Sequence, residues 1–258
     1  MFDITIGAIT DKGKTRNVNQ DFYGYYTPRI PAKRKKGVLL VLADGMGGYS
    51  GGEVASRVAV EILMANYYSD GINNTFQSIK NLFYMANESI IKKAQQDSSL
   101  KDMGTTLTAV IVKRNKLFCA HVGDSRAYLI SKDEMIQLTS DHSYVANLVR
   151  EGRITEKEAE THPERNIITR AVGAAKDLTI DTFKRKFNSK KTPYLLICSD
   201  GLYKDVSNDV IIKTVFTNKT PQIICDKLVG VANENGGSDN ITVIVVRFDD
   251  KSWYNRFF

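Results

Sequence analysis

LADGMGGYSGGEVAS, residues 42–56, joins an apolar run to a helical pattern through an Asp-Gly pair and four further glycines. Two interpretations of this stretch are open. In the first, the glycines form the phosphate-binding loop of a nucleotide-binding fold, in which parallel strands alternate with helices. In the second, Asp44 holds a metal ion and the glycines clear space around it. The remaining sequence decides between them through the arrangement of strands and helices that it predicts.

Helical periodicity begins directly after this stretch. Apolar residues recur at helical spacing from Gly52 onward, which predicts the first helix. Thr220-Pro221 supplies a capping residue and a first helical position for another helix, which Gly236-Gly237 ends. Beyond the first, we predict helices over about 75–96, 208–217 and 221–234.

Strand-like segments come in runs that are separated by the helices. Short turns join strands within a run, as at Arg114-Asn115. Such runs, with paired helices between them, predict an α+β fold with mostly antiparallel sheets. No linker or repeat divides residues 1–258, so we expect a single domain in which the polar, weakly periodic residues 144–170 form an insertion. The predicted strands are 3–10, 22–27, 38–43, 105–113, 116–123, 125–131, 178–187, 193–199 and 240–248.

Four aspartates lie at the ends of predicted strands. Asp44 and Asp200 each end an apolar run and are followed by glycine. Asp21 and Asp239 each stand directly before such a run. Because the end of one antiparallel strand lies beside the start of its neighbour, we expect the four carboxylates to converge on one edge of the sheets.

Converging carboxylates repel one another, at a cost on the order of a few kcal/mol for each pair in a partly dry site. Such a cluster persists where a cation occupies it or where some members are protonated. Carboxylate and carbonyl oxygens suit Mg²⁺, Mn²⁺ or Ca²⁺. Zinc is not expected, because the chain has three histidines and no zinc-binding Cys/His spacing. Gly45 and Gly201, having no Cβ, let a backbone carbonyl or a metal-bound water approach closely.

The nucleotide-binding interpretation fails on two counts. No Lys-Ser or Lys-Thr follows the glycines, and the third glycine of a G-x-G-x-x-G pattern is replaced by Ser50. A dinucleotide-binding fold also needs repeated strand–helix–strand units, whereas the predicted strands come in antiparallel runs. We therefore favour the metal site.

Together these segments resemble the PPM, or type 2C, family of metal-dependent Ser/Thr protein phosphatases, in its bacterial form. The resemblance covers essentially the whole chain, because eight blocks occur in order with plausible spacing. The blocks are TDKGKTRNVNQD (10–21), LADGMGGYSGGEVAS (42–56), GTTLTAVIV (104–112), AHVGDSRAYLI (120–130), LTSDHS (138–143), ITRAVG (168–173), CSDGLYKDVS (198–207) and GGSDNITVIVV (236–246).

The resemblance implies a sandwich of two antiparallel β-sheets flanked by pairs of antiparallel helices (αββα), with the insertion forming a small flap beside the site. It also implies that Asp44 bridges two Mn²⁺ or Mg²⁺ ions. The carbonyl oxygen of Gly45 binds one of these ions, and Asp200 and Asp239 hold the other.

Three further roles follow from the resemblance. Asp21 acts mainly through a metal-bound water, and Asp124 helps Asp200 to bind a third, weaker ion. Arg16 binds the substrate phosphate, which suits a forked guanidinium facing phosphate oxygens.

The implied reaction is hydrolysis of phosphoserine and phosphothreonine in proteins by a metal-activated water at a binuclear centre. The implied partners are phosphorylated proteins and a bacterial Ser/Thr kinase that the enzyme opposes, and we expect a monomer. Two positions depart from the family pattern. Met46 stands where many members carry a histidine that is a candidate general acid, so the proton donor is left open. Gln20 stands where some members carry Glu, which predicts weaker binding of one ion.

Several of these residues also have structural interpretations. We expect His121 to be a hydrogen-bonded core residue and His142 to have a structural rather than a catalytic role. Asp124 has the alternative role of capping the turn before Ser125. Arg16 has the alternative, compatible role of pairing with nearby carboxylates.

The amino-acid composition indicates a globular protein and does not suggest a membrane-spanning one. Hydrophobic residues make up 42% of the chain and charged residues 25%, as in an ordinary globular protein. No apolar run is long enough for a membrane span, and the N-terminal sequence lacks the features of a signal peptide. Three widely spaced cysteines fit reduced core thiols, so we expect a cytoplasmic protein.

Three rival functions remain at this stage. The net charge of +7 and the basic residues 28–37 suggest nucleic-acid binding, but no aromatic residue interleaves those charges. We therefore interpret 28–37 as a solvated, mobile hairpin tip and expect no nucleic-acid partner. The second rival is an inactive family member, which would lack a ligand, whereas all the expected ligands are present. The third is a phosphatase for regulatory partner-switching proteins, which shares the same site but usually carries sensor domains.

Overall fold

The computed structural model describes residues 2–47 and 51–250, in which the strands form two sheets. The first sheet has the order β1 (Phe2–Asp11), β11 (Ile241–Asp250), β10 (Tyr194–Cys198), β7 (Arg126–Ile130) and β8 (Met135–Gln137). The second has the order β2 (Asp21–Tyr26), β3 (Val38–Met46), β5 (Leu107–Lys113), β6 (Lys116–Val122) and β9 (Asp181–Lys186), and β4 (Gly104–Thr105) pairs with the end of β3. All of these strand pairs are antiparallel.

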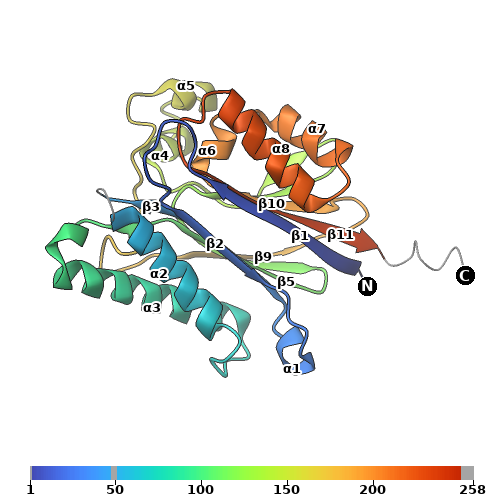
Figure 1. Ribbon diagram of the computed structural model, residues 1–258, viewed down its shortest axis with the longest axis horizontal. Helices are drawn as coiled ribbons and strands as arrows, with labels where there is room; N and C mark the ends of the chain where they lie inside the picture. The colour runs from blue at the N-terminus through green and yellow to red at the C-terminus, as the bar shows by residue number, and fades with distance from the viewer. Residues whose placement is uncertain (1, 48–50, 251–258) are drawn as a thin grey trace, which may run out of the picture.

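Helices cover the outer faces of both sheets (Figure 1). The second sheet is covered by α2 (Gly51–Asn66) and α3 (Thr75–Gln96), which a 3₁₀ turn, η1 (Ser98–Leu100), follows. The first sheet is covered by α6 (Asp200–Tyr203), α7 (Asn208–Thr217) and α8 (Pro221–Glu234). The flap contains α4 (Tyr144–Arg150) and α5 (Glu156–Thr161). The short helix α1 (Pro31–Arg34) belongs to the connection that joins β2 to β3 along the chain. This is the αββα sandwich that the family resemblance implies, and it confirms the α+β class with antiparallel sheets that the sequence pattern predicts.

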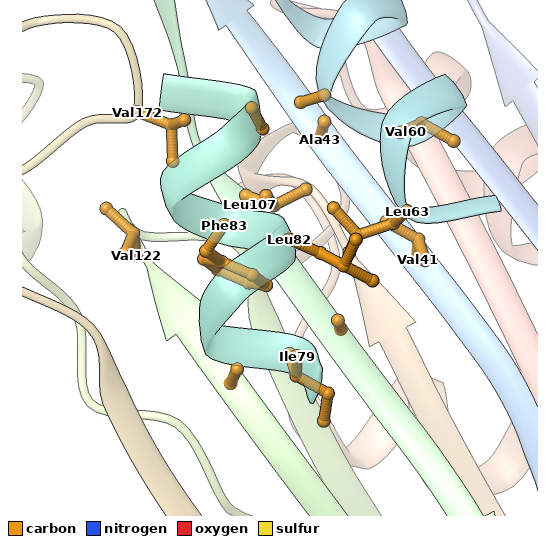
Figure 2. Packing of buried hydrophobic residues seen from close by; sticks show 14 of the residues in the cluster. Val41, Ala43, Val60, Leu63, Ile79, Leu82, Phe83, Leu107, Val122 and Val172 are labelled. Carbon is orange, nitrogen blue, oxygen red and sulfur yellow. The ribbon is translucent and has the colours of Figure 1, made fainter. Parts of the chain in front are cut away.

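The apolar run of β3 is continuous because both faces of this strand are buried. Leu39 and Val41 pack beneath α2 and α3 in one apolar cluster, and Figure 2 shows part of this cluster with Val41 labelled. Leu40 and Leu42 point the other way and pack between the two sheets against residues of β10 and β11. Because successive side chains of a strand alternate between its faces, one strand contributes to two of the three apolar layers.

The predicted elements agree closely with the observed ones. The helices predicted over 75–96, 208–217 and 221–234 are α3, α7 and α8. Asn74 caps α3 and Thr220 caps α8 through side-chain hydrogen bonds to backbone N–H groups of the first turn. The prediction missed the short β8 and α6, and residues 48–50 of the glycine-rich stretch lie outside the described residues.

Two predicted boundaries were wrong near the site. Asp44 does not end its strand, because β3 continues to Met46, where Gly45 and Met46 pair with β4. Asp21 belongs to β2 and does not precede it. Tertiary pairing extends both strands past the point at which the apolar pattern stops.

The basic segment 28–37 is more structured than a solvated hairpin tip. It contains α1, and Lys36 donates a hydrogen bond to the backbone oxygen of Tyr67 (2.7 Å) and is paired with Asp70. The Lys33 ammonium lies over the rings of Tyr26 and Tyr68, about 6 Å from their centroids. These charges are therefore partly engaged by the protein itself.

The three cysteines are buried and unpaired, as predicted. Among the described residues, every helix is too short or too polar to cross a bilayer.

Phe83 tests the packing of α3 on the second sheet. Its side chain is fully buried, so replacement by Ala should lower the free energy of unfolding by about 3–5 kcal/mol. The neighbouring Tyr84 is exposed on the other face of α3, so Tyr84→Ala should cost less than about 1 kcal/mol. Urea denaturation measures both changes, and equal losses would contradict the buried face assigned to α3.

Candidate metal centre

Asp21 and Asp44 are direct neighbours on the adjacent strands β2 and β3 of the second sheet. Thr106 fixes the backbone at Asp44. The Asp44 N–H donates to the Thr106 hydroxyl (2.9 Å), and the Thr106 N–H donates to the Asp44 carbonyl (2.8 Å). The Thr106 hydroxyl also lies 2.8 Å from that of Ser125, which follows Asp124 in sequence. Asp44 is therefore held on rigid backbone that continues to the loop of Asp124.

Ser199 joins the two sheets at this point. Its hydroxyl donates to Oδ2 of Asp21 (2.7 Å) and accepts the N–H of Thr242 (2.9 Å), so it contacts both β2 and β11. Asp200 follows directly as the first residue of α6. The hydrogen bonds of one buried serine thus bring Asp21, from the second sheet, beside Asp200, at the start of the helix that follows β10 of the first sheet.

Asn240 ties Asp239 to the segment that links β1 and β2. Its Oδ1 accepts the N–H of Gln20 (2.8 Å), and its Nδ2 donates to the carbonyls of Lys12 (2.8 Å) and Val18 (3.0 Å). Because these contacts span both ends of residues 12–20, they determine where that segment crosses from one sheet to the other.

Side-chain cations engage two of the carboxylates. Arg16, on the linking segment, donates to Oδ2 of Asp239 over 2.8 Å while its side chain stays 53% exposed. Lys204 donates to Oδ2 of Asp200 over 2.5 Å. The carboxylate-pairing role of Arg16 is thereby confirmed, and half of its side chain is still accessible to a ligand.

The two glycines that follow Asp44 and Asp200 allow close backbone contact. A Cβ on Gly45 would lie 2.0 Å from the carbonyl oxygen of Gly52, and one on Gly201 would lie 2.2 Å from that of Asn240. Neither distance is possible for real atoms. The expectation that a backbone carbonyl approaches these glycines is confirmed, and the contacts dock α2 on β3 and α6 on the start of β11.

The electrostatics show that the carboxylates converge. Burial raises the pKa of Asp44 well above its usual value, and the charges of Asp21, Asp200, Asp124 and Asp239 raise it further. Burial, with the charge of Asp200 as a further contribution, also raises the pKa of Asp21 and that of Asp124 to about 7. Five carboxylates from both sheets therefore share one region of negative potential, as the sequence predicts for four of them.

Unsatisfied oxygen atoms test whether a cation fits there. Among the described residues, Oδ1 of Asp21, Asp124 and Asp200 are buried and lack a hydrogen-bond partner. Buried carboxylate oxygens without donors are costly, and a divalent cation is the partner that such a set suits. In the same described ranges, no group of three or more Asp, Glu, His or Cys side chains has its donor atoms already in place to hold an ion. The residues fit a hard cation in chemistry, with two carboxylates engaged by Arg16 and Lys204.

The two histidines of the motifs have structural roles, as predicted. Both form hydrogen bonds with backbone atoms of Gly123, the residue before Asp124. His121, fully buried, donates from Nε2 to the Gly123 carbonyl (3.0 Å), and the Gly123 N–H donates to Nδ1 of His142 (3.0 Å). Nε2 of His142 then pairs with Asp181 (3.1 Å). Burial lowers the pKa of His121 to about 3, which keeps this ring neutral.

Sequence reasoning missed Ser199, Asn240, Thr106 and Lys204. All four lie within quoted blocks, and Ser199, Asn240 and Lys204 lie within four residues of a predicted ligand. Adjacency to those ligands was the available signal, but their hydrogen bonds reach residues up to 228 positions away, which no local pattern reveals.

Comparisons with known proteins show which proteins this chain is similar to. The sequence model of the Protein phosphatase 2C family matches residues 12–223. The serine/threonine phosphatase stp of Listeria innocua is 36% identical over 241 residues, which cover 92% of this chain and 93% of that protein.

Solved structures give the same result. Serine/threonine phosphatase Stp1 from Staphylococcus aureus superposes with a TM-score of 0.87 at 35% identity, covering 97% of this chain and 96% of that one. The catalytic domain of the serine threonine protein phosphatase PstP, solved in complex with two manganese ions, gives a TM-score of 0.82 at 31% identity. That match covers 97% of this chain and all of the PstP chain.

Asn240→Ala tests how the linking segment is held. Losing three hydrogen bonds should lower the free energy of unfolding by roughly 2–3 kcal/mol and speed amide exchange over residues 12–18. Exposed Asn208, on α7, serves as the control, and Asn208→Ala should change neither quantity. Denaturation and hydrogen-exchange mass spectrometry measure the two effects. Unaltered exchange over 12–18 in Asn240→Ala would refute the assigned role.

Proposed function

Because the chain belongs to the protein phosphatase 2C family of serine/threonine phosphatases, we propose that it hydrolyses phosphoserine and phosphothreonine in proteins at a binuclear metal centre. The single observation that carries this proposal is the convergence of Asp21, Asp44, Asp200 and Asp239 from the two sheets. A buried cluster of this charge needs cations, and the substrate phosphate is itself an anion that cations attract.

The proposed ligands divide between the two ions. Asp44 would be a ligand of both ions, the carbonyl oxygen of Gly45 would bind one, and Asp200 and Asp239 would hold the other. Asp21, whose Oδ1 is buried and has no hydrogen-bond partner, would act through a metal-bound water. Asp124 and Asp200, each with a buried unpaired Oδ1, provide for a third, weaker ion.

Divalent ions held there, Mn²⁺ or Mg²⁺, would lower the pKa of a water molecule that acts as the nucleophile and neutralise charge on the phosphoryl group. The surrounding residues position the ligands. Ser199 and Thr106 fix Asp21 and Asp44, which keeps the carboxylates in place without the substrate.

Arg16 is the proposed phosphate-binding residue. Asp239 accepts a hydrogen bond from the guanidinium and raises its pKa, although burial opposes that shift. The half-exposed guanidinium has further N–H groups with which to bind phosphate oxygens. Met46 carries no proton to transfer, so the proton of the leaving group must come from a different group.

The proposal extends to the cellular role. We expect a monomer that acts on phosphorylated proteins and opposes a Ser/Thr protein kinase, as a protein phosphatase in signal transduction does. The three unpaired cysteines support a reducing compartment such as the cytoplasm.

Metal removal tests the mechanism. Hydrolysis of p-nitrophenyl phosphate and of a phosphothreonine peptide should cease in EDTA and return with Mn²⁺. Asp239→Asn should lower kcat/KM at least about 100-fold, because it weakens a proposed ligand. Asp133→Asn removes an exposed carboxylate from the turn before β8 and should retain full activity. Full turnover in metal-free buffer would rule out the proposed chemistry.

Arg16→Ala tests phosphate binding. Loss of charge-assisted hydrogen bonds should raise KM for p-nitrophenyl phosphate about tenfold or more, with a smaller effect on kcat. Arg16→Lys, which keeps the charge but not the forked geometry, should give an intermediate KM. An unchanged KM in Arg16→Ala would leave this residue with its structural contact to Asp239 alone.

A further inference from the structure

Lys204 connects the carboxylate cluster to the flap. It lies one turn after Asp200 on the helical segment that begins with α6. Its ammonium group donates to Oδ2 of Asp200 (2.5 Å) and to the side-chain oxygen of Asn166 (2.9 Å). Asn166 belongs to the flap, 38 residues before Lys204 in sequence. One cation of the chain therefore holds a proposed metal ligand and a flap residue together.

Lys204 is a cationic side chain whose ammonium group is paired with the Asp200 carboxylate. A full positive charge thus lies among the carboxylates that are proposed to bind divalent ions.

The two oxygens of Asp200 have different partners. Oδ2 is hydrogen-bonded to Lys204, whereas Oδ1 is buried and has no hydrogen-bond partner. A divalent ion at Oδ1 is repelled by the ammonium group on the other oxygen of the same carboxylate. An ion that also binds Oδ2 must displace the Lys204 ammonium group from that oxygen, and the same ammonium group is hydrogen-bonded to Asn166.

We propose that Lys204 is an affinity-setting residue of the metal centre: it competes with a divalent cation for Asp200, and through Asn166 it couples that competition to the position of the flap. This inference rests on the proposed binuclear function. It predicts that removing the charge strengthens ion binding, because attraction by the carboxylates is then opposed by one cation fewer. It also predicts that bound ion loosens the flap near Asn166.

Calorimetric titration with Mn²⁺ tests the competition. Lys204→Met should lower the Kd for Mn²⁺ about tenfold. Lys204→Arg, which keeps the charge, should stay within about twofold of wild type. Lys213→Met removes a positive charge from the exposed face of α7 and is the matched control, with an unchanged Kd. An unchanged or higher Kd in Lys204→Met would overturn the proposal.

Hydrogen exchange tests the coupling to the flap. In wild type, Mn²⁺ should speed amide exchange in peptides covering residues 160–170. In Lys204→Met, exchange in those peptides should be fast with or without Mn²⁺, because the link is absent from the start. Exchange in wild type that is indifferent to Mn²⁺ would remove the coupling.

Asp44→Asn separates failure of this inference from failure of the proposed function. If wild type binds Mn²⁺ and Asp44→Asn does not, the result supports the proposed metal centre. The Lys204 variants then test only the inference about Lys204. If wild type binds no Mn²⁺, or Asp44→Asn binds it as tightly as wild type does, the proposed centre fails and the inference fails with it.

Discussion

Mutual repulsion among buried carboxylates is the constraint on which this structure depends. Five aspartates from both sheets share one region, where burial and neighbouring charges raise the pKa values of Asp21, Asp44 and Asp124. A fold tolerates such a cluster where rigid backbone holds the members in place and where cations or protonation offset the charge. Both conditions are visible around the site.

The rigid part comes from hydrogen bonds that join the ends of the two sheets. Ser199 links Asp21 to the strand that precedes Asp200, and Asn240 fastens the segment between β1 and β2 beside Asp239. These polar side chains are almost fully buried, and each bonds backbone or carboxylate atoms of distant segments. The apolar layers of the sandwich bring the sheets together, and these bonds decide how their ends align.

The charge is offset by two side chains that differ in exposure and in partners. Arg16 is half exposed on the linking segment, in keeping with a residue that meets a phosphate, whereas Lys204 also contacts the flap. In the proposed metal centre, these cations of the chain would influence ion binding along with the ligands, because each positive charge subtracts from the attraction that the carboxylates exert on an ion.

The sequence alone determined the layered fold and the identity of the acidic residues. Apolar periodicity and the cap at Thr220 are local signals, so α3 and α8 could be predicted nearly to the residue. Aspartates at strand ends, together with the ordered motifs, indicated the candidate site. Only the tertiary structure decided that β3 runs past Asp44, that Asn240 reaches back to Lys12, and that Lys204 bridges Asp200 to the flap. Those contacts join segments that are far apart along the chain. They form, and stabilise the fold, only when the two sheets are packed together.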